Sequence, residues 1–278
     1  MERVAVVTGA TSGIGKVTAR ELARQGFRVV LVARHADKAA RTASEIAAAA
    51  AGAGVETLLC DMSSQTQIRA AAEEVRRRHD RIHVLVNNAG GIWTKREVTE
   101  DGLERTFAVD HLGYFLLTNL LLPELRRGAP SRIVNVASEA SKLGRFDFDD
   151  LQGEKSYNGG LAYAQAKLAN ILFSSELARR IAGSGVTSNA LHPGAVASGF
   201  ALNNTGLLRF GMKLARPFLI DEEKGARTSI YLASSPEVEG VTGQYFAKNR
   251  PRKPPRKGRD PEVARRLWDV SARLCGLA

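Results

Sequence analysis

Short apolar runs that are rich in β-branched residues alternate along this chain with longer segments of helical spacing. Runs of this kind suit strands of a parallel sheet that helices cover on both faces. They occupy residues 4–7, 29–32, 55–59, 84–86, 133–136 and 186–191. Segments between them, such as 17–23 and 68–75, place apolar side chains on one helical face. This order predicts an α/β fold, a Rossmann-type doubly wound parallel sheet, whose ligand crevice lies beyond the carboxyl ends of the strands.

The chain is predicted to form a single domain over residues 1–278, because no repeat or linker interrupts the alternation and one core suits this length. Residues 261–274 begin with proline and have the pattern of a terminal helix. Residues 248–259 combine basic residues with prolines, which argues against a helix or a central strand. We expect an exposed loop there.

The formal net charge of +11 comes from basic residues scattered over several segments, so we favour solvated helix faces over a nucleic-acid site. An anionic partner for residues 248–259 stays open.

Cys60 and Cys275 are too few for a disulfide framework, and they show no metal-ligand spacing with the five histidines. A strand begins almost at Met1, which leaves no room for a signal peptide, and no stretch is long and apolar enough to cross a bilayer. These features predict a cytoplasmic protein with no metal and no membrane anchor.

A glycine-rich turn follows the first strand directly and leads into a helical pattern. It reads Thr-Gly-Ala-Thr-Ser-Gly-Ile-Gly from Thr8 to Gly15. Glycines let the backbone approach a pyrophosphate, and the helix N-terminus offers free N–H groups and a positive dipole to the anion. An ordinary loop between a strand and a helix seldom needs three glycines, so we predict dinucleotide binding. The candidate contacts are Gly9, Thr11, Ser12, Gly13, Ile14 and Gly15.

The end of the second strand distinguishes the two nicotinamide cofactors. An acidic residue there would bind the ribose hydroxyls of NAD(H), whereas an arginine would bind the 2′-phosphate of NADP(H). The chain has Arg34 at this place, and Lys16 beside the glycine turn is a second candidate cation. We therefore favour NADP(H), with NAD(H) as the alternative and with an Arg34 that points into water as the simpler explanation.

Further polar residues follow the third and fourth strands. Asp61 and Met62 come after the third strand, and Asn88, Ala89 and Gly90 come after the fourth. At the carboxyl edge of the sheet these residues are candidates to contact the adenine and the ribose. Asp61 by itself could equally be the N-cap of a helix.

Tyr163 and Lys167 stand four residues apart in a segment with helical character, so both side chains lie on one helical face. A phenol with its ordinary pKa of about 10 is a poor acid-base catalyst at neutral pH, but a nearby ammonium lowers that pKa. Tyr163 would then serve as general acid or base. Ser138 follows the fifth strand and could donate a hydrogen bond to the substrate oxygen. Taken singly, each of these residues is more often a packing or capping residue.

These motifs together resemble the short-chain dehydrogenase/reductase superfamily over nearly the whole chain. The resemblance rests on Thr8 to Gly15, Asp61, Asn87 to Gly90, Ser138, Tyr163 with Lys167, and Pro193-Gly194 leading through Val196 to Ser198. It implies that Tyr163 transfers the proton and that Ser138 orients and stabilises the substrate oxygen. It also implies that Lys167 binds the nicotinamide ribose and lowers the tyrosine pKa, and that Pro193, Gly194, Val196 and Ser198 contact the nicotinamide end.

One residue departs from the family pattern. The family usually has an asparagine where this chain has Asp110, and the backbone carbonyl of that asparagine holds a water that connects to the lysine. Asp110 keeps a backbone carbonyl, so we expect the relay to survive with altered electrostatics. A carboxylate near Lys167 would compete for its charge.

Three segments, 148–160, 163–170 and 264–268, resemble the retinol dehydrogenase-like branch, which includes the oxidoreductase domain of WW domain-containing oxidoreductases. Residues 199–218 are rich in large apolar side chains and are expected either to cover a lipophilic carbonyl substrate or to form a helix without a ligand. The resemblance leaves open a homodimer or a homotetramer. A non-catalytic dinucleotide sensor is the alternative function, but it would be expected to lose Tyr163 or Lys167.

Overall fold

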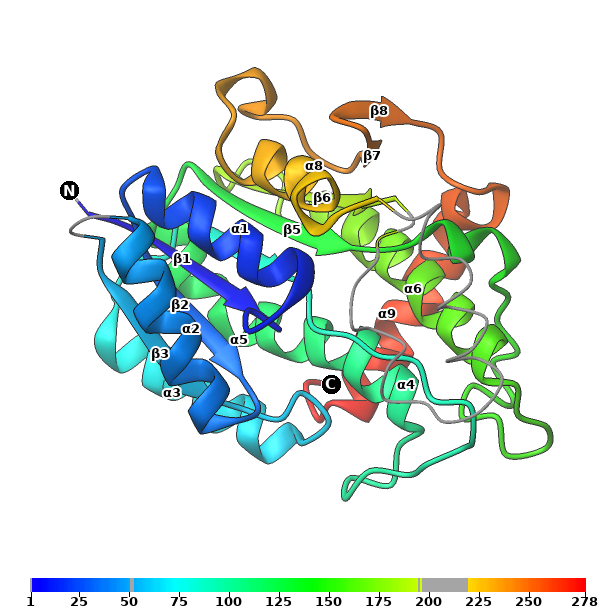
Figure 1. Cartoon of the computed structure of the whole chain (residues 1–278). Coiled ribbons are helices and arrows are strands. Elements are labelled where there is room, and N and C mark those ends of the chain that lie inside the picture. The colour runs from blue at the N-terminus through cyan, green and yellow to red at the C-terminus, as the bar shows by residue number, and fades with distance from the viewer. Residues whose placement is uncertain (1, 51–52, 195, 197–219) are drawn as a thin grey trace.

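A sheet of eight strands in the order β3-β2-β1-β4-β5-β6-β7-β8 forms the centre of the protein (Figure 1). The computed structural model describes residues 2–50, 53–194, 196 and 220–278. The strands are β1 (Arg3–Thr8), β2 (Phe27–Ala33), β3 (Val55–Leu59), β4 (Val84–Asn87), β5 (Ser131–Val136), β6 (Val186–His192), β7 (Tyr245–Ala247) and β8 (Arg250–Arg252). The first six strands lie where the apolar runs predict them.

The strands from β1 to β7 pair in parallel, and only β8 is antiparallel to its neighbour. The chain moves outward from β1 to β3 and then crosses back to β4, so the crevice between the loops after β1 and β4 is the switch point of the sheet. The prediction of a doubly wound parallel sheet in a single domain is confirmed.

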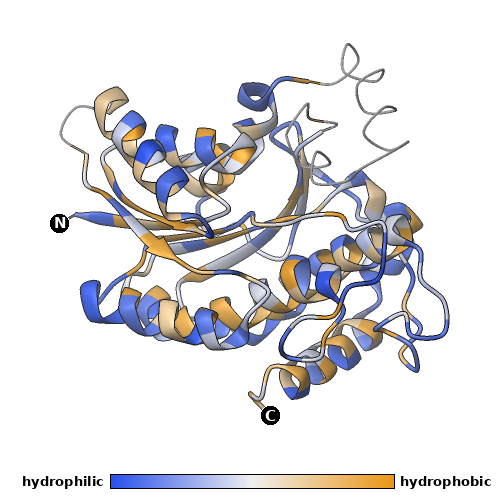
Figure 2. Ribbon diagram, turned by 60° about the horizontal axis from the view of Figure 1, so that its bottom comes forward, coloured by the Kyte–Doolittle hydropathy of each residue, from blue (hydrophilic) through white to orange (hydrophobic). Residues whose placement is uncertain are grey.

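Helices cover both faces of the sheet and turn their apolar sides toward it (Figure 2). Successive residues of a strand point to opposite faces, so Val4 and Val6 join one core while Ala5 and Val7 join the other. The helices on the first face are α3 (Gln65–Arg78), α5 (Gly113–Arg127), α6 (Gly159–Arg180) and α9 (Pro261–Leu274), and those on the second are α1 (Gly13–Arg24), α2 (Ala36–Ala49) and α8 (Glu222–Ser234).

The terminal helix α9 has the predicted bounds, and its structure explains them. Asp260 caps it by accepting hydrogen bonds from the backbone of Glu262 and Val263, and Pro261 occupies the first turn, where no N–H is needed. Trp268 packs on Phe115 of α5 and Phe173 of α6, with ring centroids 4.8 and 5.8 Å apart. In the part of the chain that the structure describes, no helix combines the length and the apolar character needed to cross a membrane.

The expectation of an irregular loop over residues 248–259 is wrong in part. Residues 250–252 form β8, which pairs with β7 through a tight turn at Lys248 and Asn249, whose φ angles are 53° and 58°. Pro251 is tolerated because β8 is an edge strand, whose outer side needs no ladder hydrogen bond. Residues 256–259 form a short 3₁₀ helix. The basic side chains of the segment are exposed, as expected.

Candidate active site

The carboxyl ends of the parallel strands bring the predicted site residues to one edge of the sheet. The glycine turn lies between β1 and α1, and Ser12 is the N-cap residue of α1. Gly9 and Gly13 have φ angles of +64° and +57°, a conformation that glycine adopts without strain. Thr11 is half-buried and Ser12 is exposed, so the turn faces solvent at the helix N-terminus. Ile14 lies inside, close to the base of α8.

Hydrogen bonds join the start of the glycine turn to the loop after β4. The hydroxyl of Thr8 accepts hydrogen bonds from the backbone of Asn88 and Ala89 at 2.9 and 3.0 Å, and the Asn88 amide donates to the carbonyl of Thr8 at 2.9 Å. A Cβ on Gly9 would lie 2.8 Å from the Ala89 backbone, and one on Gly15 would lie 2.4 Å from Asn88. Both glycines are therefore required by close packing against the loop after β4, a reason that adds to the tight turn and the approach to a pyrophosphate expected from the sequence.

The two candidate cations have different surroundings. Lys16 forms an ion pair with Glu45 of α2. Arg34 follows β2 directly, is exposed, and has no hydrogen bond or ion pair with any residue that the structure describes. Arg34 is thus the cation that is available at the end of β2.

Asp61 is not a helix cap. One of its carboxylate oxygens accepts hydrogen bonds from the backbone and hydroxyl of Ser63 at 2.9 and 2.8 Å, while Ser64 is the N-cap of α3. Asp61 and the buried Met62 lie after β3 at the same sheet edge as the glycine turn.

The residues proposed for chemistry come from the segment after β5 and from helix α6. Ser138 follows β5, and Tyr163 and Lys167 lie on the first turns of α6. The Ser138 side chain lies close enough to Tyr163 to lower the pKa of its phenol. The Lys167 ammonium lies 5.5 Å from the centre of the Tyr163 ring and 5.4 Å from that of Tyr114. The four-residue spacing thus puts phenol and ammonium side by side.

Asp110 forms a direct ion pair with Lys167. The distance between Asp110 Oδ2 and Lys167 Nζ is 3.1 Å, and the two side chains are 0% and 3% exposed. The other carboxylate oxygen accepts a hydrogen bond from the backbone of Gly91 at 2.8 Å. A Cβ on Gly90 would lie 3.1 Å from the carboxylate and 3.2 Å from the ammonium, so this glycine leaves room for the pair.

The electrostatics of Tyr163 differ from the sequence-based expectation. Burial and the negative charge of Asp110 raise the pKa of Tyr163 above its ordinary value, and the Ser138 side chain opposes this shift only in part. Burial also raises the pKa of Asp110 to about 6, although Lys167 and the Gly91 N–H favour the carboxylate. Burial and Asp110 thus outweigh the lowering of the tyrosine pKa that was expected from Lys167, whose ammonium is paired with the Asp110 carboxylate.

Asn170, which sequence reasoning did not select, ties these elements together. Its amide donates to the backbone carbonyl of Asp110 at 2.9 Å and of Val136 at 3.3 Å. Its carbonyl lies 3.3 Å from His111, which contacts Ser271 of α9 at 2.9 Å. Asp110 itself lies in a π-helical turn, Ala108–Leu112, an irregularity common at functional sites. The carbonyl expected to hold a relay water thus already accepts a bond from Asn170.

The loop after β6 is described only at its start. Pro193 and Gly194 follow His192 directly, and Gly194 has a φ of +99°. Val196 forms a bridge with Ile220, and a Cβ on Gly225 of α8 would lie 2.6 Å from it. Ser198 and residues 199–218 lie outside the described residues.

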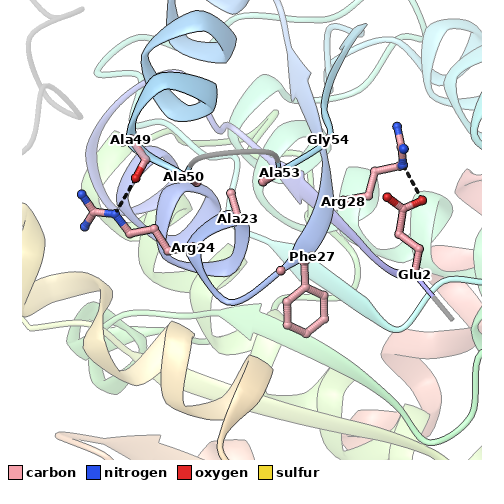
Figure 3. A pocket seen from close by; sticks show the side chains of 10 residues that line it. Glu2, Ala23, Arg24, Phe27, Arg28, Ala49, Ala50, Ala53 and Gly54 are labelled. Carbon is pink, nitrogen blue, oxygen red and sulfur yellow. Dashed lines mark hydrogen bonds and ion pairs between the residues drawn. The ribbon is translucent and has the colours of Figure 1, made fainter.

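Two hollows lie away from Tyr163. The larger, of about 350 Å³, opens at the amino ends of β1 and β2, where Arg28 bonds Glu2 and Arg24 bonds the carbonyl of Ala49 (Figure 3). It is at the wrong edge of the sheet, and its arginines are already paired. The smaller, of about 230 Å³, adjoins Asp61 and Ser63. Within the described ranges, no group of three or more His, Cys, Asp and Glu could hold a metal ion.

Known proteins resemble this chain in sequence and in structure. A family profile for short chain dehydrogenases matches residues 3–206. Retinol dehydrogenase 11 of Homo sapiens is 45% identical over 275 residues, which cover 99% of this chain and 86% of that protein. A solved structure of an uncharacterised protein from Mycobacterium paratuberculosis matches with a TM-score of 0.79 and 33% identity, over 99% of this chain and 93% of that one. A variant of actinorhodin polyketide ketoreductase with NADPH matches with a TM-score of 0.70 and 28% identity, over 88% and 95%.

Proposed function

Because the chain belongs to the short-chain dehydrogenase/reductase family, in its retinol dehydrogenase-like branch, it is a dinucleotide-dependent oxidoreductase, and we propose that it transfers hydride between NADP(H) and the carbonyl or alcohol carbon of a lipophilic compound. The observation that carries the proposal is the meeting of Ser138, Tyr163 and Lys167 at the sheet edge that also bears the glycine turn.

The residues at this edge fit a dinucleotide. The turn from Gly9 to Gly15 presents the free N-terminus of α1, where backbone N–H groups would bind the pyrophosphate. Arg34 would bind the 2′-phosphate, and Asp61 and Met62 lie where the adenine would be held. Asn88, Ala89 and Gly90 border the ribose position. The solved ketoreductase with NADPH supports this choice of cofactor by similarity.

Arg34→Ala is expected to weaken NADPH binding roughly tenfold to a hundredfold, since a charge-assisted hydrogen bond contributes about 1.5–3 kcal/mol. The affinity for NADH should change little, because NADH lacks the phosphate that Arg34 would bind. Fluorescence titration of both cofactors gives the two Kd values. Arg24→Ala is the matched control, since this arginine lies in the last turn of α1, at the opposite end from the glycine turn, and pairs with Glu21. Equal losses for NADPH and NADH in Arg34→Ala would contradict a 2′-phosphate contact.

The cofactor supplies or accepts the hydride, and this chain's side chains handle the proton and the developing charge. We infer that the Ser138 hydroxyl orients the substrate oxygen and that Tyr163 donates a proton to it during reduction. The raised pKa of Tyr163 keeps the phenol protonated at neutral pH, which is the form a general acid needs. Oxidation needs the phenolate and is therefore expected to require alkaline conditions.

Asp110→Asn is expected to move the alkaline rise of alcohol oxidation to lower pH. The carboxylate raises the pKa of Tyr163, so its removal makes the phenolate available at a lower pH and frees the Lys167 ammonium to favour it. The measurement is kcat/KM for oxidation against pH in both proteins. Identical profiles would show that the charge of Asp110 has no catalytic part. Asp149→Asn, an exposed aspartate on the loop between β5 and α6, is the control.

A lipophilic substrate is supported by the names of the relatives, retinol dehydrogenases.

A cofactor titration followed by a panel of carbonyl compounds tests the function. We expect NADPH consumption with hydrophobic ketones or aldehydes and little with small polar ones. A protein that binds NADPH but turns over no carbonyl or alcohol would instead be the non-catalytic sensor. Activity with small polar carbonyls alone would overturn the lipophilic substrate class and leave the oxidoreductase assignment standing.

A further inference from the structure

His192 joins two loops of the site that are far apart in the sequence. It is the last residue of β6 and stands directly before Pro193. Its Nδ1 accepts a hydrogen bond from the backbone N–H of Glu139 at 3.1 Å and lies 3.4 Å from the backbone N of Gly194, which also donates to it. Glu139 follows Ser138 immediately, and Gly194 belongs to the loop that leads toward the nicotinamide position. One imidazole nitrogen thus binds both loops.

These contacts determine which nitrogen of the His192 imidazole carries the proton. A nitrogen that accepts from two backbone N–H groups carries no proton, so the ring proton resides on Nε2. Nε2 lies 3.5 Å from the carboxylate of Glu139, which also pairs with Lys142. The side chain of His192 is 17% exposed. A single neutral tautomer is therefore the form that satisfies all the partners.

The bond to Glu139 bears directly on the Ser138 backbone. The Glu139 N–H belongs to the same peptide plane as the Ser138 carbonyl, so His192 restrains the rotation of that plane. Ser138 has an extended backbone, with φ −155° and ψ 158°, and its hydroxyl also accepts a bond from the backbone of Ala140 at 3.2 Å. Without the imidazole acceptor, the Glu139 N–H loses the protein group that orients it. The direction of the Ser138 hydroxyl depends on that orientation.

We propose that His192 is a positioning residue that aligns Ser138 with the nicotinamide-side loop through its unprotonated Nδ1, and that protonation of this nitrogen releases both loops and lowers activity at acid pH. The inference rests on the proposed function, since it concerns the same reacting centre. It adds a residue outside the set of Ser138, Tyr163 and Lys167.

Burial and the neighbouring charges determine the direction in which the pKa of His192 is shifted. Burial lowers the pKa of His192 below its ordinary value; the carboxylate of Glu139 opposes this shift and the ammonium of Lys142 adds to it. Tyr245 of β7 also lies near Glu139, and burial and that carboxylate raise its pKa, so it stays neutral. A depressed folded-state pKa means that the contribution of the ring is fully present above about pH 6.5 and is lost as pH falls through the folded pKa.

Three substitutions of His192 distinguish the effect of the hydrogen-bond acceptor from the effect of the side-chain volume. His192→Asn places a carbonyl oxygen near the Nδ1 position and does not titrate, whereas His192→Gln places it near Nε2, and His192→Leu has no acceptor. We expect kcat of the Leu and Gln variants to fall roughly tenfold or more, because Ser138 would be misaligned. The Asn variant should stay close to native kcat and should lack the loss of activity at acid pH that we expect of the native protein.

A double-mutant cycle tests whether His192 acts through Ser138. In a Ser138→Ala background, His192→Leu should cost much less in kcat than it does in the native protein, since coupled residues are not additive. Native kcat and an unchanged pH profile in His192→Leu would overturn the proposal. So would equal losses in both backgrounds, or an Asn variant as impaired as the Leu variant.

The tautomer gives a readout that does not depend on turnover. In ¹⁵N NMR of the imidazole, the proposal requires an unprotonated Nδ1 and a protonated Nε2 near neutral pH. The opposite tautomer would overturn it even if no substrate is found. Absence of carbonyl turnover in the native protein, with the expected tautomer, would count against the proposed function and leave the His192 contacts supported.

Discussion

Tyr163→Phe is expected to lower kcat for carbonyl reduction roughly a hundredfold to ten-thousandfold, the usual range for loss of a general acid. The change removes one oxygen, the proton donor, from a half-buried side chain. The ring remains beside Lys167, so the NADPH affinity and the free energy of unfolding should change little. Steady-state kinetics, a cofactor titration and urea unfolding measure the three quantities.

Tyr231→Phe provides the matched control for that experiment. Tyr231 lies on α8, and its hydroxyl bonds Glu237 at 3.0 Å on an exposed surface. It should lose neither activity nor stability beyond about 0.5 kcal/mol, as surface substitutions generally do. Full activity in Tyr163→Phe would remove Tyr163 from the chemistry and with it the proposed proton transfer.

Lys167→Met is expected to reduce both activity and stability, the latter by about 3–5 kcal/mol, because it leaves the buried Asp110 without its counter-ion. The double variant Asp110→Asn with Lys167→Met should recover most of the free energy of unfolding, since no unpaired charge remains. Its kcat should stay low, because the ammonium beside Tyr163 is still missing. A double variant as unstable as Lys167→Met would show that packing, rather than charge, causes the loss.

The stability loss in Lys167→Met should depend on pH. The native pKa of Asp110 is already raised to about 6, and removal of the ammonium raises it further. A carboxyl whose folded-state pKa exceeds its unfolded value contributes stability that is present below the unfolded pKa, about 3.9, and is lost as pH rises through the folded pKa. The variant should therefore differ least from the native protein near pH 4 and most near pH 8. Urea unfolding at these two values measures the difference, and a loss that does not change with pH would contradict it.

The elements of the fold were predictable because their signals are local. An apolar β-branched run, a glycine turn and a helical stripe each lie within about ten residues, and alternation of such signals leaves few ways to build a sheet. Residues 248–259 show the limit of this reasoning. Their prolines excluded a central strand correctly, but only the neighbouring β7 decides that residues 250–252 form an edge strand.

The residues of the candidate site could be predicted from the sequence, but the ion pair, the hydrogen bonds and the pKa shifts within it could not. Ser138, Tyr163 and Lys167 could be selected from their order and spacing, and Asp110 from its departure from a family pattern. The ion pair of Asp110 with Lys167, the bonds of Asn170 to the carbonyls of Asp110 and Val136, and the two bonds to His192 join residues that are remote in the sequence.

For this protein, the amino-acid sequence alone determined the strand and helix order, the glycine turn after the first strand, and the placing of Tyr163 and Lys167 on one helical face. Each of these follows from backbone periodicity over short distances. The tertiary structure decided how far Tyr163 is shielded from water and that Asp110 faces Lys167, and burial and this carboxylate together raise the pKa of Tyr163. The physical reason is that a pKa depends on burial and on charges within a few ångströms, and both arise only when distant segments pack together.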